Sequence, residues 1–136
     1  MSANIEFDEV YEYSTLKSGI TVPVKLEFTE NQVAFTAKID TGSNHSIFER
    51  KYGQQLEIEI EKGIELTFNT ATGNFHAYGH ELTLSVLGIE TVSTVYFAES
   101  DYFDRNVLGR IGWLDRVKLG LIEQEGKLFL SEYNKS

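Results

Sequence analysis

The sequence has 136 residues, a length that fits one domain of ordinary size. It contains no cysteine, which excludes disulfide frameworks, thiolate zinc sites and cysteine nucleophiles. Hydrophobic residues make up 41% and charged residues 24%, and 21 acidic residues against 12 Lys and Arg give a formal net charge of -9. Because phosphate groups would repel such a chain, we expect neither a nucleic acid nor an anionic membrane as a partner.

The N-terminal segment is acidic and lacks the basic and apolar regions of a signal peptide. No apolar run approaches the length needed to span a bilayer. These features lead us to expect a cytoplasmic protein. We also expect an acidic, loosely ordered arm over residues 1–20, followed by one domain over residues 21–136.

Apolar and polar residues alternate with a period of two through most of the domain, which predicts a mostly β fold. The first two alternating runs flank a polar turn at 29–32 and predict a hairpin of strands 22–28 and 33–39. Further strands are expected, in chain order, at 56–60, 64–68, 82–86, 90–98, 117–122 and 127–133. The glutamates at 57, 59 and 61 are interpreted as the solvent-exposed face of an edge strand.

The sequence gives little evidence for helices. Ser46 and Glu49 have the spacing of a capping box, which predicts a helix that starts at Ser46 and ends at about Gln54. A second short helix is expected over residues 111–116.

Three segments carry the information about function. A predicted strand runs directly into Asp40-Thr41-Gly42-Ser43, which places a carboxylate on a tight turn at a strand end. Alone this is a weak signal, because Asp and Gly are common in turns. The other two segments are Asn69-Thr70-Ala71-Thr72-Gly73-Asn74-Phe75 and Val107-Leu108-Gly109-Arg110.

With these segments in this order, the chain from about residue 21 to residue 133 resembles the retropepsin-like aspartic proteases, especially their small bacterial members. The resemblance implies a closed β-barrel of the acid-protease half, with a flap hairpin and one or two short helices. It implies that Asp40 is catalytic and that Thr41, Gly42 and Ser43 support its loop. It further implies a flap containing Ala71, Thr72, Gly73, Asn74 and Phe75, and structural support from Val107, Leu108, Gly109 and Arg110.

Peptide hydrolysis by activated water requires one ionised carboxylate and one protonated carboxylic acid, the shared-proton pattern of aspartic proteases. The chain has a single Asp-Thr-Gly, so the simplest arrangement is a homodimer in which Asp40 meets its own copy across a twofold axis. The resemblance implies that Thr41 bonds to the other subunit's loop and that Ser43 donates to the catalytic carboxylate. Ser43 would then favour activity in acid. The expected substrate is a peptide or protein bound as an extended strand, and no cofactor is expected.

Several alternatives stay open. The family's usual carboxylate four residues after the catalytic Asp is Asn44 here, which leaves the expected partner of a partly buried Arg110 in doubt. Alternative interpretations are a catalytically silent dimerisation or peptide-binding module, and a monomer that needs a partner to complete its site. The aromatics Phe75 and Tyr78 fit either a cover over substrate or ordinary strand packing. Core packing is the preferred interpretation of Ile47, Phe48 and Val107, although each fits a specificity pocket.

Two further expectations concern metals and assembly. His76 and His80 lie four residues apart on a predicted strand, about 13 Å from one another, so no metal site is expected. The segment from Asp101 to Asn106 is interpreted as a solvated loop. Strand 127–133 is the candidate dimer interface, with Leu128 and Phe129 as its anchors.

Overall fold

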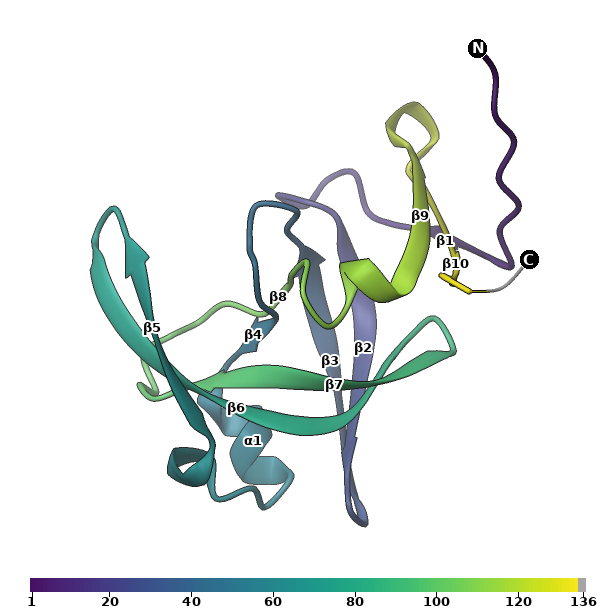
Figure 1. The fold of residues 1–136 in the computed structure, drawn as a ribbon. Helices are drawn as coiled ribbons and strands as arrows, with labels where there is room; N and C mark the ends of the chain where they lie inside the picture. Colours follow the sequence, from purple (N-terminus) through teal and green to yellow (C-terminus); the bar gives the residue numbers. More distant parts are fainter. Residues whose placement is uncertain (135–136) are drawn as a thin grey trace.

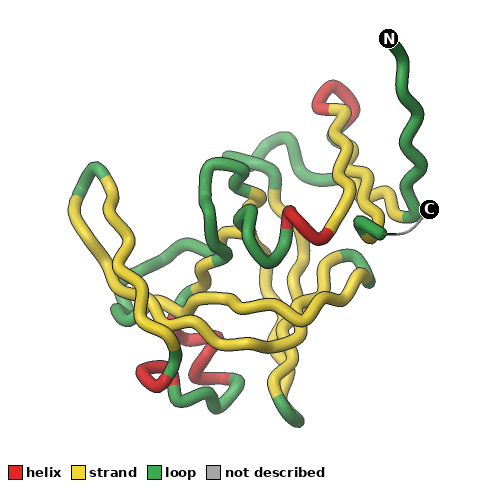
Figure 2. Tube along the Cα trace, viewed as in Figure 1, coloured by secondary structure: helices red, strands yellow, loops and turns green. Residues whose placement is uncertain are grey.

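The computed structural model describes residues 1–134, so the last two residues of the expected domain lie outside the described residues. Strands make up most of this structure (Figure 2). The strands are β1 (Glu9–Glu12), β2 (Thr21–Phe28), β3 (Asn31–Ile39), β4 (Ile47–Phe48), β5 (Ile64–Thr70), β6 (Gly73–Val86), β7 (Ile89–Ala98), β8 (Val107–Leu108), β9 (Val117–Ile122) and β10 (Lys127–Glu132). The helical segments are α1 (Arg50–Gln55) and the 3-10 turns η1 (Ile60–Lys62), η2 (Leu114–Arg116) and η3 (Glu123–Glu125).

The main sheet has the order β2-β3-β8-β4-β7-β6-β5, and an additional pairing of β2 with β6 closes it into a barrel (Figure 1). Strand β6 makes this closure possible because it is long. One of its edges pairs with β7, while the other pairs with β5 near its start and with β2 near its end. The predicted hairpin of β2 and β3 is confirmed, with a turn of only two residues, Thr29 and Glu30.

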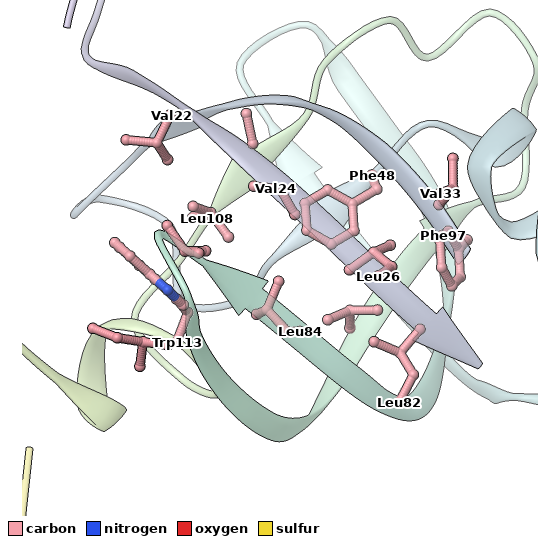
Figure 3. Packing of buried hydrophobic residues seen from close by; sticks show 14 of the residues in the cluster. Val22, Val24, Leu26, Val33, Phe48, Leu82, Leu84, Phe97, Leu108 and Trp113 are labelled. Atoms are coloured by element: carbon pink, nitrogen blue, oxygen red, sulfur yellow. The ribbon is translucent and has the colours of Figure 1, made fainter. Parts of the chain in front are cut away.

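The core fills the barrel with the apolar faces of these strands (Figure 3). Alternate residues of β2 (Val22, Val24 and Leu26) are at most 2% exposed, as period-two burial requires. Trp113 and Phe48 are the largest of the fully buried side chains. Phe48 is therefore a core residue, as preferred from the sequence.

The chain ends form a second, three-stranded sheet of order β1-β10-β9 beside the barrel (Figure 1). Leu128 and Leu130 of β10 are fully buried in the chain's own core. Both edges of β10 are occupied, and Phe129 packs against Phe7 with ring centroids 5.7 Å apart. Strand β10 is thus part of the chain's own sheet and core, and its expected role at a dimer interface stays a prediction. Because β1 lies in the expected arm, the middle of that arm is paired with the domain.

The expected strand at 56–60 is wrong, although its pattern of burial is correct. Leu56, Ile58 and Ile60 are all buried, while the intervening glutamates are exposed. The backbone is not extended there, because Glu57 has a φ of 61° and residues from Ile60 onward form η1. Alternating burial therefore arises here from an irregular segment packed beside α1, and the glutamates belong to no edge strand.

The expected helix start at Ser46 is also wrong. Residues Ile47 and Phe48 form β4, which pairs with β7 and β8, and α1 begins only at Arg50. The Ser46 hydroxyl accepts a hydrogen bond from the amide of Gly109 at 3.0 Å instead of capping a helix. The second expected helix is limited to the single turn η2. Within residues 1–134, no helix has the length and apolar character needed to cross a membrane.

Candidate active site

Asp40 follows directly on the end of β3, and its loop is held by the backbone around it. The amide of Asp40 donates to the carbonyl of Leu108 at 2.9 Å. The amide of Gly42 donates to Asp40 Oδ1 at 2.9 Å, and the amide of Ser43 donates to the carbonyl of Asp40 at 3.1 Å. The turn thus fixes the half-buried carboxylate against its own backbone, while Thr41 is exposed at the tip.

Strand β8 and the residues after it support this loop by backbone hydrogen bonds. Strand β8 lies between β3 and β4, parallel to β3. The amide of Arg110 donates to the carbonyl of Ser43 at 2.9 Å, and the amide of Ile111 donates to that of Asn44 at 2.8 Å. A Cβ atom on Gly109 would lie 2.3 Å from the carbonyl oxygen of His45. The contact therefore requires glycine, and segment 107–110 lies where a structural support for the loop is expected.

A cleft of about 540 Å³ opens between the Asp40 loop and the hairpin of β5 and β6. The loop side contributes Asp40, Gly42, Ser43, Asn44 and His45, and the hairpin contributes Leu66, Thr67, Phe68, Asn69, Thr70 and Phe75. Ile47, Phe103, Arg105 and Val107 complete its lining. The carboxylate thus shares one concave site with the inner face of a hairpin, which is the common form of a small-ligand or peptide site.

Aromatic rings form one wall of this cleft. Phe68 stacks on Phe75 with centroids 5.0 Å apart, and Phe75 contacts Phe103 at 4.9 Å. The ring of His45 packs edge-on against Tyr96 at 4.9 Å and against Phe68 at 5.8 Å. Burial among these groups lowers the pKa of the His45 imidazole from its ordinary value of 6.5. The loop and the hairpin are therefore joined through ring contacts.

The hairpin of β5 and β6 projects from the barrel, with its turn at the free end (Figure 1). The turn residues Ala71 and Thr72 are exposed, and Gly73 has a φ of 130°, a conformation that favours glycine. Thr70 Oγ1 donates to the carbonyl of Gly73 at 2.6 Å and closes the turn. Ala71, Thr72, Gly73 and Asn74 lie at the tip outside the cleft lining, whereas Phe75 lies inside it.

Phe75 and Tyr78, which fit either a cover over substrate or strand packing, differ in their surroundings. Phe75 faces the cleft, whereas Tyr78 is buried and donates hydrogen bonds to Glu99 at 2.9 Å and to Glu65 at 3.2 Å. The bond to Glu99, with burial and the bond to Glu65, raises the pKa of Tyr78 to about 12. Tyr78 is thus a packing residue. Of the other residues for which a pocket role was considered, Ile47 and Val107 line the cleft.

Two expected contacts of the loop differ in the structure. The hydroxyl of Ser43 donates to the carbonyl of His45 at 2.7 Å, and not to the carboxylate of Asp40. Arg110 is exposed, and among residues 1–134 no carboxylate lies within ion-pair distance of its guanidinium. Asn44, which lines the same hollow as Arg110, is uncharged and offers it no ion-pair partner.

Six residues of the cleft were missed as site residues from the sequence: His45, Leu66, Thr67, Phe68, Phe103 and Arg105. The loop from Asp101 to Asn106 was interpreted as solvated, yet Phe103 is half-buried against Phe75. The sequence signal for Phe103 and Arg105 was an aromatic residue two positions before an arginine, just ahead of segment 107–110. The described residues contain no group of three His, Asp or Glu side chains that could hold a metal ion. His76 contacts Thr67 and His80 contacts the carbonyl of Ile60.

Comparison with solved structures gives a clear relationship at the level of the fold. The crystal structure of a retropepsin-like aspartic protease from Rickettsia conorii is similar to this chain, with a TM-score of 0.63 and 18% sequence identity. The match covers 90% of this chain and 97% of that one. The fold is retropepsin-like. No family model and no curated protein matches the sequence, so the relationship rests on the structure.

Proposed function

We propose that this protein is an aspartic endopeptidase that works as a homodimer, with Asp40 of each subunit forming the catalytic pair. The observation that carries the proposal is the position of Asp40. On a retropepsin-like fold, Asp40 lies on a hydrogen-bonded turn that lines the same cleft as the β5–β6 hairpin.

The proposed chemistry uses two carboxylates that share one proton. The ionised Asp40 takes a proton from a water molecule, whose oxygen attacks the carbonyl carbon of the peptide bond. The protonated Asp40 donates its proton to the carbonyl oxygen. When the tetrahedral intermediate breaks down, the first Asp40 gives the proton taken from water to the leaving nitrogen, the second Asp40 takes a proton from a hydroxyl of the intermediate, and the C–N bond breaks. Two carboxylates held close cannot both ionise, which keeps one of them protonated.

The need for two subunits follows from the single Asp-Thr-Gly of the chain. Asp40 is only half-buried, and Thr41 beside it is exposed at the tip of the loop. Both residues are thus accessible to a second copy of the loop across a twofold axis. In this dimer the Thr41 hydroxyl would bond to the partner's loop.

The proposed substrate is a peptide in an extended conformation, lying between the Asp40 loop and the β5–β6 hairpin, which would act as the flap. Thr67, Asn69 and Thr70 line the hairpin side of the cleft with polar groups, and Phe68 and Phe75 line it with rings. An extended peptide satisfies its main-chain groups by hydrogen bonds to a strand and places alternate side chains in pockets.

The test compares the wild type with Asp40→Asn, which keeps the shape of the side chain and removes its charge. Sedimentation equilibrium and cleavage of a mixed peptide library are measured from acid to neutral pH. We expect a dimeric wild type that cleaves and a folded Asp40→Asn variant that does not. The matched control is Asp101→Asn, an exposed aspartate outside the cleft lining, which should cleave like the wild type.

A second candidate function is a retropepsin-fold dimerisation or peptide-binding module without catalysis. Two observations favour it: the Ser43 hydroxyl is engaged by His45, and Arg110 lacks a carboxylate partner among the described residues. Folded dimers that cleave nothing at any pH would support this module. A folded wild type that remains monomeric and inactive would instead indicate that a partner chain completes the site.

A further inference from the structure

The four arginines of the chain fall into two groups. Arg50 forms an ion pair with Glu61, and Arg116 forms one with Asp115. Among residues 1–134, no carboxylate lies within ion-pair distance of Arg105 or Arg110. Within the described residues, the positive charges of these two arginines are therefore not neutralised by an ion pair, which also holds for Lys17 and Lys38.

Both arginines lie beside the Asp40 loop. Arg105 lines the cleft together with Asp40. Arg110 lines a neighbouring hollow, and the two concavities share Asn44. Asp40 and Arg105 are the only Asp, Glu, Lys or Arg residues in this cleft lining of the described chain, so Arg105 supplies its one permanent positive charge.

Packing positions the Arg105 guanidinium at the cleft. Its central carbon lies 5.3 Å from the centroid of Phe103, and Phe103 in turn packs on Phe75 of the hairpin. A guanidinium on a ring face keeps its N–H donors free at its edge. Because Arg105 is exposed, these donors are accessible from the cleft. A planar fork of N–H donors matches the two oxygens of a carboxylate.

We propose that Arg105 forms a subsite that binds a carboxylate of the peptide in the cleft. The inference deepens the proposed function, because it requires that a peptide occupies this cleft. The aromatic wall beside Arg105 receives an apolar side chain of the same peptide. The carboxylate comes from an Asp or Glu side chain or from the peptide's C-terminus, and both sources present the same two oxygens.

The experiment measures peptide binding without cleavage, using the full-length chain with Asp40→Asn. Fluorescence anisotropy follows labelled peptides with apolar residues and a single Glu placed at each position in turn, each paired with the same peptide carrying Gln. Free and amidated C-termini of the Gln peptides separate the two sources of carboxylate. At one position, or at the C-terminus, we expect the carboxylate to tighten binding about tenfold.

Arg105→Gln in the same background should abolish this preference, so that the Glu and Gln peptides bind with equal affinity. Arg105→Glu should reverse the preference, so that a peptide with Lys at the same position binds more tightly than one with Glu. The charge-matched control is Lys62→Gln, an exposed lysine paired with Glu59 outside the cleft, which should retain the preference. Circular dichroism verifies that each variant is folded.

The outcomes separate this inference from the proposed function. If peptides bind and the wild type cleaves them, but the ratio of Glu to Gln affinities does not change in Arg105→Gln, only the inference is overturned. If an Arg105-dependent preference is found and the wild type cleaves nothing, the inference holds and the proposed catalysis is overturned. If no peptide binds and none is cleaved, both are overturned.

Discussion

Gly109 offers a direct test of how the Asp40 loop is held. An alanine there would place its Cβ 2.3 Å from the carbonyl oxygen of His45, 2.5 Å from its carbonyl carbon and 2.8 Å from the carbonyl oxygen of Ser43. All three are backbone atoms, so no side chain can rotate away to relieve the overlap. The strand and the loop must therefore separate by about 1 Å to restore ordinary contact distances.

The cost of that separation can be worked out from the contacts it breaks. The hydrogen bonds from Arg110 to Ser43 and from Ile111 to Asn44 are 2.9 and 2.8 Å long. A shift of about 1 Å stretches them beyond useful length, at about 1 kcal/mol each. Overpacking adds about 1–3 kcal/mol. We therefore expect Gly109→Ala to lower the free energy of unfolding by about 3–5 kcal/mol, a large part of the ~5–15 kcal/mol of a typical domain.

Urea denaturation followed by the fluorescence of Trp113, the single tryptophan, measures this loss. Trp113 is 1% exposed, so its emission should shift strongly on unfolding. Gly88→Ala is the matched control, since a Cβ there meets nothing within 4 Å and only the φ of 81° is unfavourable. It should cost about 1 kcal/mol. A Gly109→Ala protein as stable as the Gly88→Ala protein would refute the close-packing argument.

Two further predictions concern the same loop. Because burial lowers the pKa of His45, the unfolded chain takes up a proton at this residue more readily than the folded chain. The contribution of the neutral imidazole to the free energy of unfolding is therefore present above pH 6.5 and is lost as the pH falls through the lowered pKa. Between pH 7.5 and about 5, the His45→Gln variant should therefore lose less free energy of unfolding than the wild type. Urea midpoints at the two pH values measure this difference. An equal loss in both proteins would contradict the prediction. Ser43→Ala loses the hydrogen bond to the His45 carbonyl and should cost about 1 kcal/mol in a urea titration. Its pH–rate profile should keep the wild-type optimum, and a shift toward higher pH would show that Ser43 acts on Asp40 after all.

The sequence predicted best those elements whose pairing is local. The hairpin of β2 and β3 joins strands separated by a short turn, so alternation and turn residues suffice to predict it. The same holds for β9 and β10, which pair across η3. The sequence also predicted the position of Asp40 at a strand end.

Prediction failed where a distant partner decided the local conformation. Ser46 has the pattern of a helix cap, yet its hydroxyl bonds to Gly109, 63 positions away, and the residues after it join the sheet. The alternation at Leu56, Ile58 and Ile60 indicated burial correctly and conformation wrongly. Burial of every second residue does not require an extended backbone here, because this irregular segment packs beside α1.

The sequence by itself determined that this is a mostly β domain with one candidate catalytic carboxylate on a glycine turn, because alternation and turn chemistry are properties of neighbouring residues. Only the tertiary structure decided what surrounds that carboxylate. Gly109 supports its loop from below, the rings of Phe68, Phe75 and Phe103 form the wall of the cleft, and Arg105 is placed in the cleft beside it. These groups come from segments far apart in the chain, and closure of the barrel brings them together.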